Sequence, residues 1–175
     1  MITIDSIIGN IYRDKNLGNE YNEMLSKSLT ESVKISRMES QRVRMRKTST
    51  KGTDIALTLP PGTKLRHGDV IFRTSNQMIV IELEPENVIS LTLKENIYDD
   101  PDHDNVVQIS ARIGHAIGNL HRPLKFEGRT IYFPIQAESE VEMFRKIFSP
   151  LEDHLEIKSV KMVFEPDEGM DVHEH

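Results

Sequence analysis

The chain has 175 residues, of which 37% are hydrophobic and 29% are charged, and its formal net charge is −6. This is the composition of a globular protein with one ordinary domain or two small ones, and no apolar run reaches the roughly 18 residues that a membrane span needs. The absence of cysteine excludes disulfides and thiolate metal ligands. The start, "MITIDSIIGN", lacks the basic region and cleavage site of a signal peptide, so we expect a cytoplasmic protein. The acidic balance argues against nucleic acid as the main partner.

The first part of the chain is predicted to be a small β domain, residues 1–76. Within it, "EYNEMLSKSL" has apolar residues at helical spacing, which predicts a short helix or a mobile flap. From Val33 the apolar period changes to two, on either side of a turn near "MESQ". "TDIALTL" is a further strand candidate, and "PPGTKLRHGDVIF" contains two turns before another strand. "MIVIELE", residues 78–84, is a strand candidate just after this boundary.

A basic stretch lies within this domain, at residues 33–51. It contains one acidic residue, Glu39, and seven basic residues: Lys34, Arg37, Arg42, Arg44, Arg46, Lys47 and Lys51. One interpretation is the solvated face of a hairpin. The other is a docking face for an acidic partner protein.

The second part, residues 77–165, is predicted to alternate strands and helices. A strand at "VISLTLKE" precedes a helix over about 103–119, for which "DDPDHD" supplies capping acids and a proline. Two strands then flank Gly128, a helix capped by Ser139 follows, and "LEIKSVKMVFE" is the last strand. This order is that of a ferredoxin-like βαββαβ domain, so the fold class is α+β. Residues 166–175 are acidic and poor in apolar residues, which predicts a flexible, disordered tail.

Catalytic motifs are not recognisable in the sequence, so we do not expect an enzyme: it has no Ser/His/Asp set in a known context and no glycine loop that would hold a phosphate. The seven histidines favour metal binding instead. Two of them, His173 and His175, stand in the last segment, "VHEH", where two imidazoles and a carboxylate can wrap around a cation.

The stretch "AIGNLHRP" places His121 just after the predicted end of a helix, close to Gly118 and before Pro123. In one interpretation it is a side chain that interacts favourably with the C-terminal carbonyls of the helix. In the other it is a metal ligand. One histidine cannot hold a divalent ion, but on the two-fold axis of a symmetric dimer a single residue appears twice.

Three motifs, in matching order and spacing, resemble the UreE urease accessory proteins, which are nickel metallochaperones. "LTLPPGTKLRHGDVIF" is similar to a pattern in the N-terminal β domain of that family. "AIGNLHRPL" resembles its Gly-Asn-Arg-His signature, with Leu120 where arginine is usual, and "FEPDEG" resembles the segment before its histidine-bearing tail.

The resemblance implies a homodimer that binds Ni²⁺ through His121 and its symmetry mate, with His173 and His175 completing or extending the site. It implies an N-terminal domain like a chaperone peptide-binding domain and a ferredoxin-like second domain. It also implies delivery of nickel to urease, with the urease accessory GTPase and the urease apoprotein complex as partners. Imidazole and carboxylate ligands also suit Zn²⁺ and Cu²⁺, which we expect to bind in vitro.

Two alternatives remain open from the residues. The first is a protein-interaction module of ferredoxin-like fold without a metal-dependent role. The second is an RNA-binding ferredoxin-like domain, but "PLKFEG" and "TIYFPIQ" offer few of the aromatic residues on which sheet-based readers stack bases.

Overall fold

The computed structural model describes residues 1–95 and 104–170, and the chain divides into two compact units, Met1–Glu84 and Pro85–His175. The boundary therefore follows Glu84 and not residue 76, where the sequence analysis placed it. The reason is that strand β7 (Met78–Leu83) pairs with β3 (Thr30–Ile35) inside the first unit. Among the helices of the described residues, none is long and apolar enough to cross a membrane.

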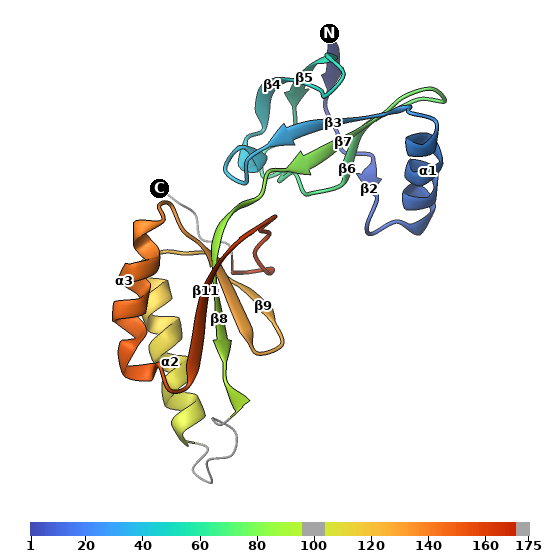
Figure 1. Ribbon diagram of the computed structural model, residues 1–175. Helices are drawn as coiled ribbons and strands as arrows, with labels where there is room; N and C mark the ends of the chain where they lie inside the picture. The colour runs from blue at the N-terminus through green and yellow to red at the C-terminus, as the bar shows by residue number, and fades with distance from the viewer. Residues whose placement is uncertain (96–103, 171–175) are drawn as a thin grey trace. The chain divides into compact units, whose positions relative to one another are not determined.

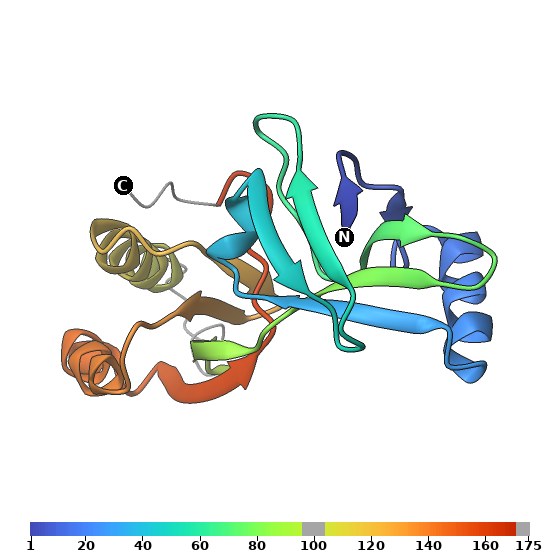
Figure 2. The same cartoon turned by 90° about the horizontal axis from the view of Figure 1, so that it is seen from above.

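The first unit contains two sheets and one α-helix (Figure 1). The strand order is β1-β5-β4 in one sheet and β2-β6-β7-β3 in the other. Figures 1 and 2 show the strands of the first sheet crossing β3 and β7. Besides β3 and β7, its elements are β1 (Ile2–Ile4), β2 (Gly9–Asn10), α1 (Lys15–Ser26), the short 3-10 helix η1 (Glu39–Gln41), β4 (Arg44–Thr48), β5 (Asp54–Thr58) and β6 (Asp69–Arg73).

Helix α1 confirms the helical spacing read in the N-terminal segment. The carboxylate of Asp14 caps its first turn, because it accepts hydrogen bonds from the N–H groups of Asn16 (2.9 Å) and Leu17 (3.2 Å). The helix buries Leu17 and Met24 against Val70, Met78 and Val80 of the four-stranded sheet, which ties it to that sheet's face.

The basic stretch does not form one hairpin. β3 and β4 belong to different sheets, and β4 forms its hairpin with β5. β4 is the last strand of its sheet, and Arg42, Arg44 and Arg46 are exposed on it or just before it. Arg46 is partly neutralised, since it forms two hydrogen bonds, at 2.9 and 2.8 Å, with the carboxylate of Asp54.

Over its described residues, 85–95 and 104–170, the second unit contains one four-stranded antiparallel sheet and two α-helices, in the predicted strand–helix–strand–strand–helix–strand order. The strand order in the sheet is β11-β8-β10-β9. Both helices lie on the same face of the sheet (Figures 1 and 2). The elements are β8 (Glu86–Leu93), α2 (Asp104–Asn119), β9 (Lys125–Glu127), β10 (Thr130–Pro134), α3 (Ser139–Phe148), the short 3-10 helix η3 (Ser149–Leu151) and β11 (Leu155–Met162).

The core of the second unit lies between the helices and the sheet. The buried side chains come from alternate positions of β8 and β10 and from one face of each helix: Ile89, Leu91, Ile109, Ile113, Ile117, Phe133, Val141, Phe144 and Phe148. Leu120 and Ile147 have the helical spacing of the buried residues before them, but both are exposed. Ser139 does not cap α3 as predicted, because it is the first helical residue and Glu138 precedes it without a side-chain cap. Of the segment expected to supply the capping acids, residues 99–103 lie outside the described residues, and Asp104 is the first residue of α2.

The predicted tail, residues 166–175, is tied to the second unit over its described part. The N–H of Asp167 donates to the carbonyl of Leu124 (2.9 Å), and the N–H of Leu124 donates to the carbonyl of Met170 (3.2 Å). The carboxylate of Asp167 also accepts from the N–H of Phe126 (2.8 Å). Residues 166–170 are therefore held beside the segment that enters β9, which corrects the prediction of a free appendage from residue 166.

Candidate metal centre

His121 occupies a defined position in the turn that ends α2. Its N–H donates to the carbonyl of Gly118 (3.0 Å), and the N–H of Arg122 reaches back to the carbonyl of Ile117 (3.5 Å). These two bonds form a Schellman motif, which satisfies the last carbonyls of a helix. The residue at the centre of that motif adopts a left-handed conformation, and His121 does so with φ of 50°. The helix ends at Asn119, as predicted, and His121 lies in the turn that closes it.

The left-handed backbone is unfavourable for a residue with a Cβ atom, and glycine is the usual occupant. It does not by itself indicate function, because α1 ends in the same way. There the N–H of Ser28 donates to Leu25 (3.0 Å), the N–H of Leu29 donates to Met24 (2.9 Å), and Ser28 has φ of 58°. The chain thus contains two equivalent helix ends, only one of which presents an imidazole.

Comparison of the two helix ends predicts that the stability of the turn does not depend on the imidazole of His121. Replacing His121 by glycine should raise the free energy of unfolding by about 0.5–1 kcal/mol, since the left-handed strain disappears while the unfolded chain gains some entropy. Ser28→Gly should do the same for the first unit. Urea unfolding followed by circular dichroism measures both effects. A loss of stability in His121→Gly would mean that the imidazole itself holds the turn together, contrary to this account.

The residue after His121 anchors the turn to α3. The guanidinium of Arg122 donates to both carboxylate oxygens of Glu140, each at 3.1 Å, and the two side chains are only 10% and 18% exposed. Glu140 also accepts the N–H of Gln136 (3.2 Å). Because Pro123 is buried as well, the backbone on the C-terminal side of His121 is fixed in place. The exposed imidazole therefore projects from a rigid support.

An exposed stripe of small and apolar residues runs along α2 towards His121. It consists of Val107, Ala111, Gly114 and Gly118, spaced by four, three and four residues, which places them on one face of the helix. Val107 is 68% exposed, and a Cβ atom at either glycine would meet no other atom within 4 Å. We call this surface the α2 stripe. All four of its residues are exposed, so a helix of another molecule can pack against it.

The remaining histidines of the described residues do not join His121 in a metal site. His115 is exposed on α2, and its Nε2 atom lies 3.0 Å from the amide nitrogen of Asn119. The Nδ1 atom of His67 accepts the N–H of Leu83 (3.1 Å) in the first unit. Within residues 1–95 and 104–170, no three His, Asp or Glu side chains are grouped so that they could hold a metal ion. His173 and His175 of the predicted ligand set lie outside the described residues. Of the three predicted ligands, the structure therefore describes the position of His121.

The sequence singles out His121 as a candidate ligand but does not show the two features that position it. The proline after it was a usable signal, because proline often follows a helix that ends in a Schellman motif. The bond between Arg122 and Glu140 had no signal in the sequence, since it joins residues 18 positions apart on different elements.

The chain was compared with proteins of known families. Residues 4–84 match the family described as UreE urease accessory protein, N-terminal domain, and this range ends where the first unit ends. A urease accessory protein UreE of Natronomonas pharaonis is 27% identical over 138 residues, 79% of this chain. Its counterparts in Yersinia pestis and Yersinia pseudotuberculosis are 28% identical over 137 residues, 77% of this chain.

These matches extend beyond the first unit, because 137 or 138 residues cannot fit within Met1–Glu84. The chain spans 57–61% of the length of these relatives. The similarity to the UreE urease accessory proteins therefore covers the first unit, as a match to their N-terminal domain, and continues into the second unit.

Proposed function

We propose that this protein is a cytoplasmic nickel metallochaperone that binds Ni²⁺ at a homodimer interface and delivers it for assembly of the urease active site. It acts by ligand exchange and is not an enzyme. The observation that carries the proposal is the position of His121, an exposed imidazole on a rigid helix end, next to the α2 stripe.

The α2 stripe supports a dimer in which α2 packs against its own copy. Glycines at two of its four positions allow close approach of helix backbones. A two-fold axis near the Gly118 end of the stripe brings the two His121 side chains together, so that one residue supplies two ligands. The ion pair of Arg122 with Glu140 fixes the backbone that carries each imidazole before the metal arrives, which reduces the entropy lost on binding.

The held segment 166–170 supports participation of the last histidines. Met170 is bonded to Leu124, which is three residues after His121. His173 follows Met170 by three residues, and an extended chain spans at most about 3.6 Å per residue, or about 11 Å here. His173 and His175 can therefore supply further imidazoles to the same ion, because two ligands from the dimer axis do not complete the coordination of a transition metal.

The metal is assigned as nickel on the grounds of the family resemblance, and the ligand chemistry is compatible with it. Neutral imidazole binds Ni²⁺, Zn²⁺ and Cu²⁺, and Cu²⁺ binds most tightly of the divalent ions. Selection of nickel over the other ions then depends on which metal ions the cell supplies and on the partner proteins. We infer that these are the urease accessory GTPase and the urease apoprotein complex, with the ferredoxin-like second unit holding the metal and the peptide-binding-like first unit contacting protein.

Two truncations test the role of the last segment. Removal of residues 171–175 should leave the unfolding transition unchanged and weaken nickel binding, because it takes away His173 and His175 only. Removal of residues 167–175 should also lower the unfolding midpoint, since the bonds of Asp167 and Met170 to the β9 segment are lost. Thermal unfolding and nickel titration of both variants measure this. Unchanged nickel affinity in both would show that His121 works without the last histidines.

The proposal as a whole is tested by calorimetric titration of the purified protein with nickel, zinc and copper. We expect saturable nickel binding with one tight site for every two chains. A protein that bound none of the three ions would instead be the interaction module without a metal-dependent role.

A further inference from the structure

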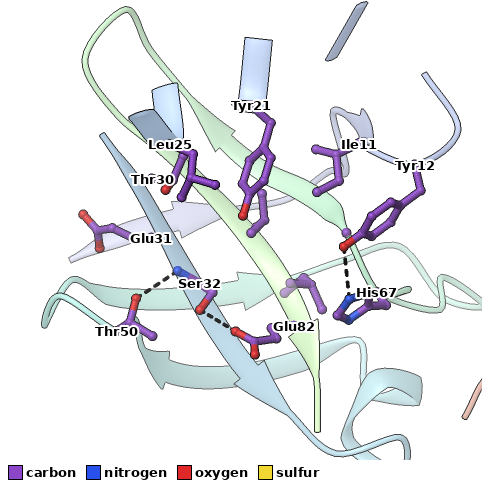
Figure 3. A pocket seen from close by; sticks show the side chains of 13 residues that line it. Ile11, Tyr12, Tyr21, Leu25, Thr30, Glu31, Ser32, Thr50, His67 and Glu82 are labelled. Atoms are coloured by element: carbon purple, nitrogen blue, oxygen red, sulfur yellow. Dashed lines mark hydrogen bonds between the residues drawn. The ribbon is translucent and has the colours of Figure 1, made fainter. Parts of the chain in front are cut away.

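The first unit contains a pocket of about 420 Å³ that the nickel site does not use. It lies between α1, β3, β7 and the segment after β2 (Figure 3). Its apolar lining includes Leu25, Val80 and Ile81. Pockets of this size accommodate a small molecule or a single long side chain.

The polar part of the lining has a negative formal charge. It includes two carboxylates, Glu31 and Glu82, and two phenols, Tyr12 and Tyr21, but no lysine or arginine. His67 also lines the pocket, and its Nδ1 atom accepts the N–H of Leu83 at 3.1 Å.

Of the two carboxylates, Glu82 is the one available to a ligand. Glu31 already accepts hydrogen bonds from Ser49, Thr53 and Gln77. Glu82 accepts one hydrogen bond, from the hydroxyl of Ser32 (2.8 Å), and its other oxygen is 4.0 Å from the ammonium of Lys34. That distance is the limit for an ion pair, and the Glu82 side chain is 43% exposed, so its charge is weakly compensated.

The two tyrosines supply aromatic surface beside this carboxylate. The ring of Tyr12 stacks on His67 with 5.5 Å between centroids and 9° between planes, and its hydroxyl lies 3.3 Å from His67 Nε2. These contacts fix the ring at the rim of the pocket (Figure 3). Tyr21 points its hydroxyl into the space above β7 (Figure 3). Burial raises the pKa of Tyr21, and the nearby Tyr12 and Glu82 raise it further, because they disfavour a second negative charge.

We propose that this pocket binds the cationic side chain of a lysine or arginine from an extended segment of a partner protein. A weakly compensated carboxylate beside aromatic faces, with no lysine or arginine among the lining residues, is an arrangement that attracts organic cations. The apolar lining suits the methylene stem of such a side chain, and Glu82 suits its charged end. β3, which forms one wall, is the last strand of its sheet, but Thr50 already bonds the backbone N–H and carbonyl of Ser32 on that edge. The partner therefore contributes a side chain to the pocket and not a paired strand. This inference is independent of nickel binding.

The test uses acetylated and amidated pentapeptides, Gly-Gly-X-Gly-Gly, titrated into the ¹⁵N-labelled full chain and followed by two-dimensional NMR. X is arginine, lysine, or norleucine, which keeps the stem of lysine without its charge. We expect the arginine and lysine peptides to shift amide signals of the pocket residues, and the norleucine peptide to leave them in place. The shifts should weaken as salt is added, since exposed charges are screened.

Matched variants locate the effect. Glu82→Gln keeps the hydrogen bond with Ser32 but removes the charge, and should weaken arginine-peptide binding about fivefold or more. Glu84→Gln removes an exposed charge two residues further on, outside the pocket, and should bind like the parent. Tyr21→Phe should retain binding and Tyr21→Leu should lose part of it, because the ring face contributes. Equal binding of the norleucine and lysine peptides, or parent-like binding by Glu82→Gln, would overturn the proposal.

Discussion

Replacing His121 by alanine should lower the affinity for nickel by more than about 100-fold. Removing one outer-shell partner of a metal ligand already lowers metal affinity by about 10–100-fold, and here two direct ligands of the dimer site disappear together. The folded state should persist, because His121 is exposed and its strained turn does not depend on the imidazole. Calorimetric titration at neutral pH, beside the parent protein, measures the loss.

Two controls separate loss of the ligand from loss of structure. His121→Gly should lose nickel as completely as His121→Ala although it unfolds at higher urea concentration. His115→Ala removes an exposed imidazole from the same helix, and its bond with Asn119, but should keep the parent affinity. If His115→Ala and His121→Ala lost nickel to the same extent, the site would not be specific to the helix end.

Gly114→Arg should convert the dimer into a monomer. A side chain at this position meets no atom of its own protomer within 4 Å of the Cβ, so the fold of one chain tolerates it. In the proposed dimer the same side chain would stand in the contact between two copies of the α2 stripe. Arginine also favours a helix over glycine by about 1 kcal/mol, so the monomer should be at least as stable as the parent. Sedimentation equilibrium measures the association.

Gly114 precedes His121 by seven residues, or about two helical turns, so the substitution does not change the metal ligand itself. Nickel binding should fall with the dimer, because a monomer presents one His121 and not two. Gln108→Arg adds the same charge to an exposed position of α2 that is off the stripe, and should leave both the dimer and nickel binding intact. A Gly114→Arg protein that remained dimeric would place the interface elsewhere.

The second unit was the more predictable part of the fold. Its helices and strands differ in apolar period, and each is bounded by a glycine, a proline or a run of acids, so local sequence determines the order of elements. The incorrect predictions concern residues whose burial or hydrogen bonding depends on segments distant in the sequence. Ile147 has the helical spacing of a core residue, but Phe144 and Phe148 take the buried positions on α3. Residues 166–170 look like a free tail and are held only because β9 offers bonding partners.

The first unit was less predictable because neighbouring strands in its sequence join different sheets. The alternation around the "MESQ" turn predicted a hairpin, but β3 pairs in parallel with β7, and a parallel partner is always distant in sequence. The pocket of Tyr12, Tyr21 and Glu82 depends on that pairing and on the docking of α1, so no local motif could indicate it. His121 was found from a short motif, yet its left-handed backbone and its support by Arg122 became visible only in the structure.

Native mass spectrometry of the protein with added nickel tests whether His121 binds the ion at a dimer interface, because it reports dimerisation and metal content together. We expect a dimer of the parent chain that carries one tightly held nickel ion, and a His121→Ala dimer that carries none at the same nickel concentration. A parent monomer that holds nickel, or a His121→Ala dimer that still holds it, would show that the ion is not bound by His121 across a dimer interface.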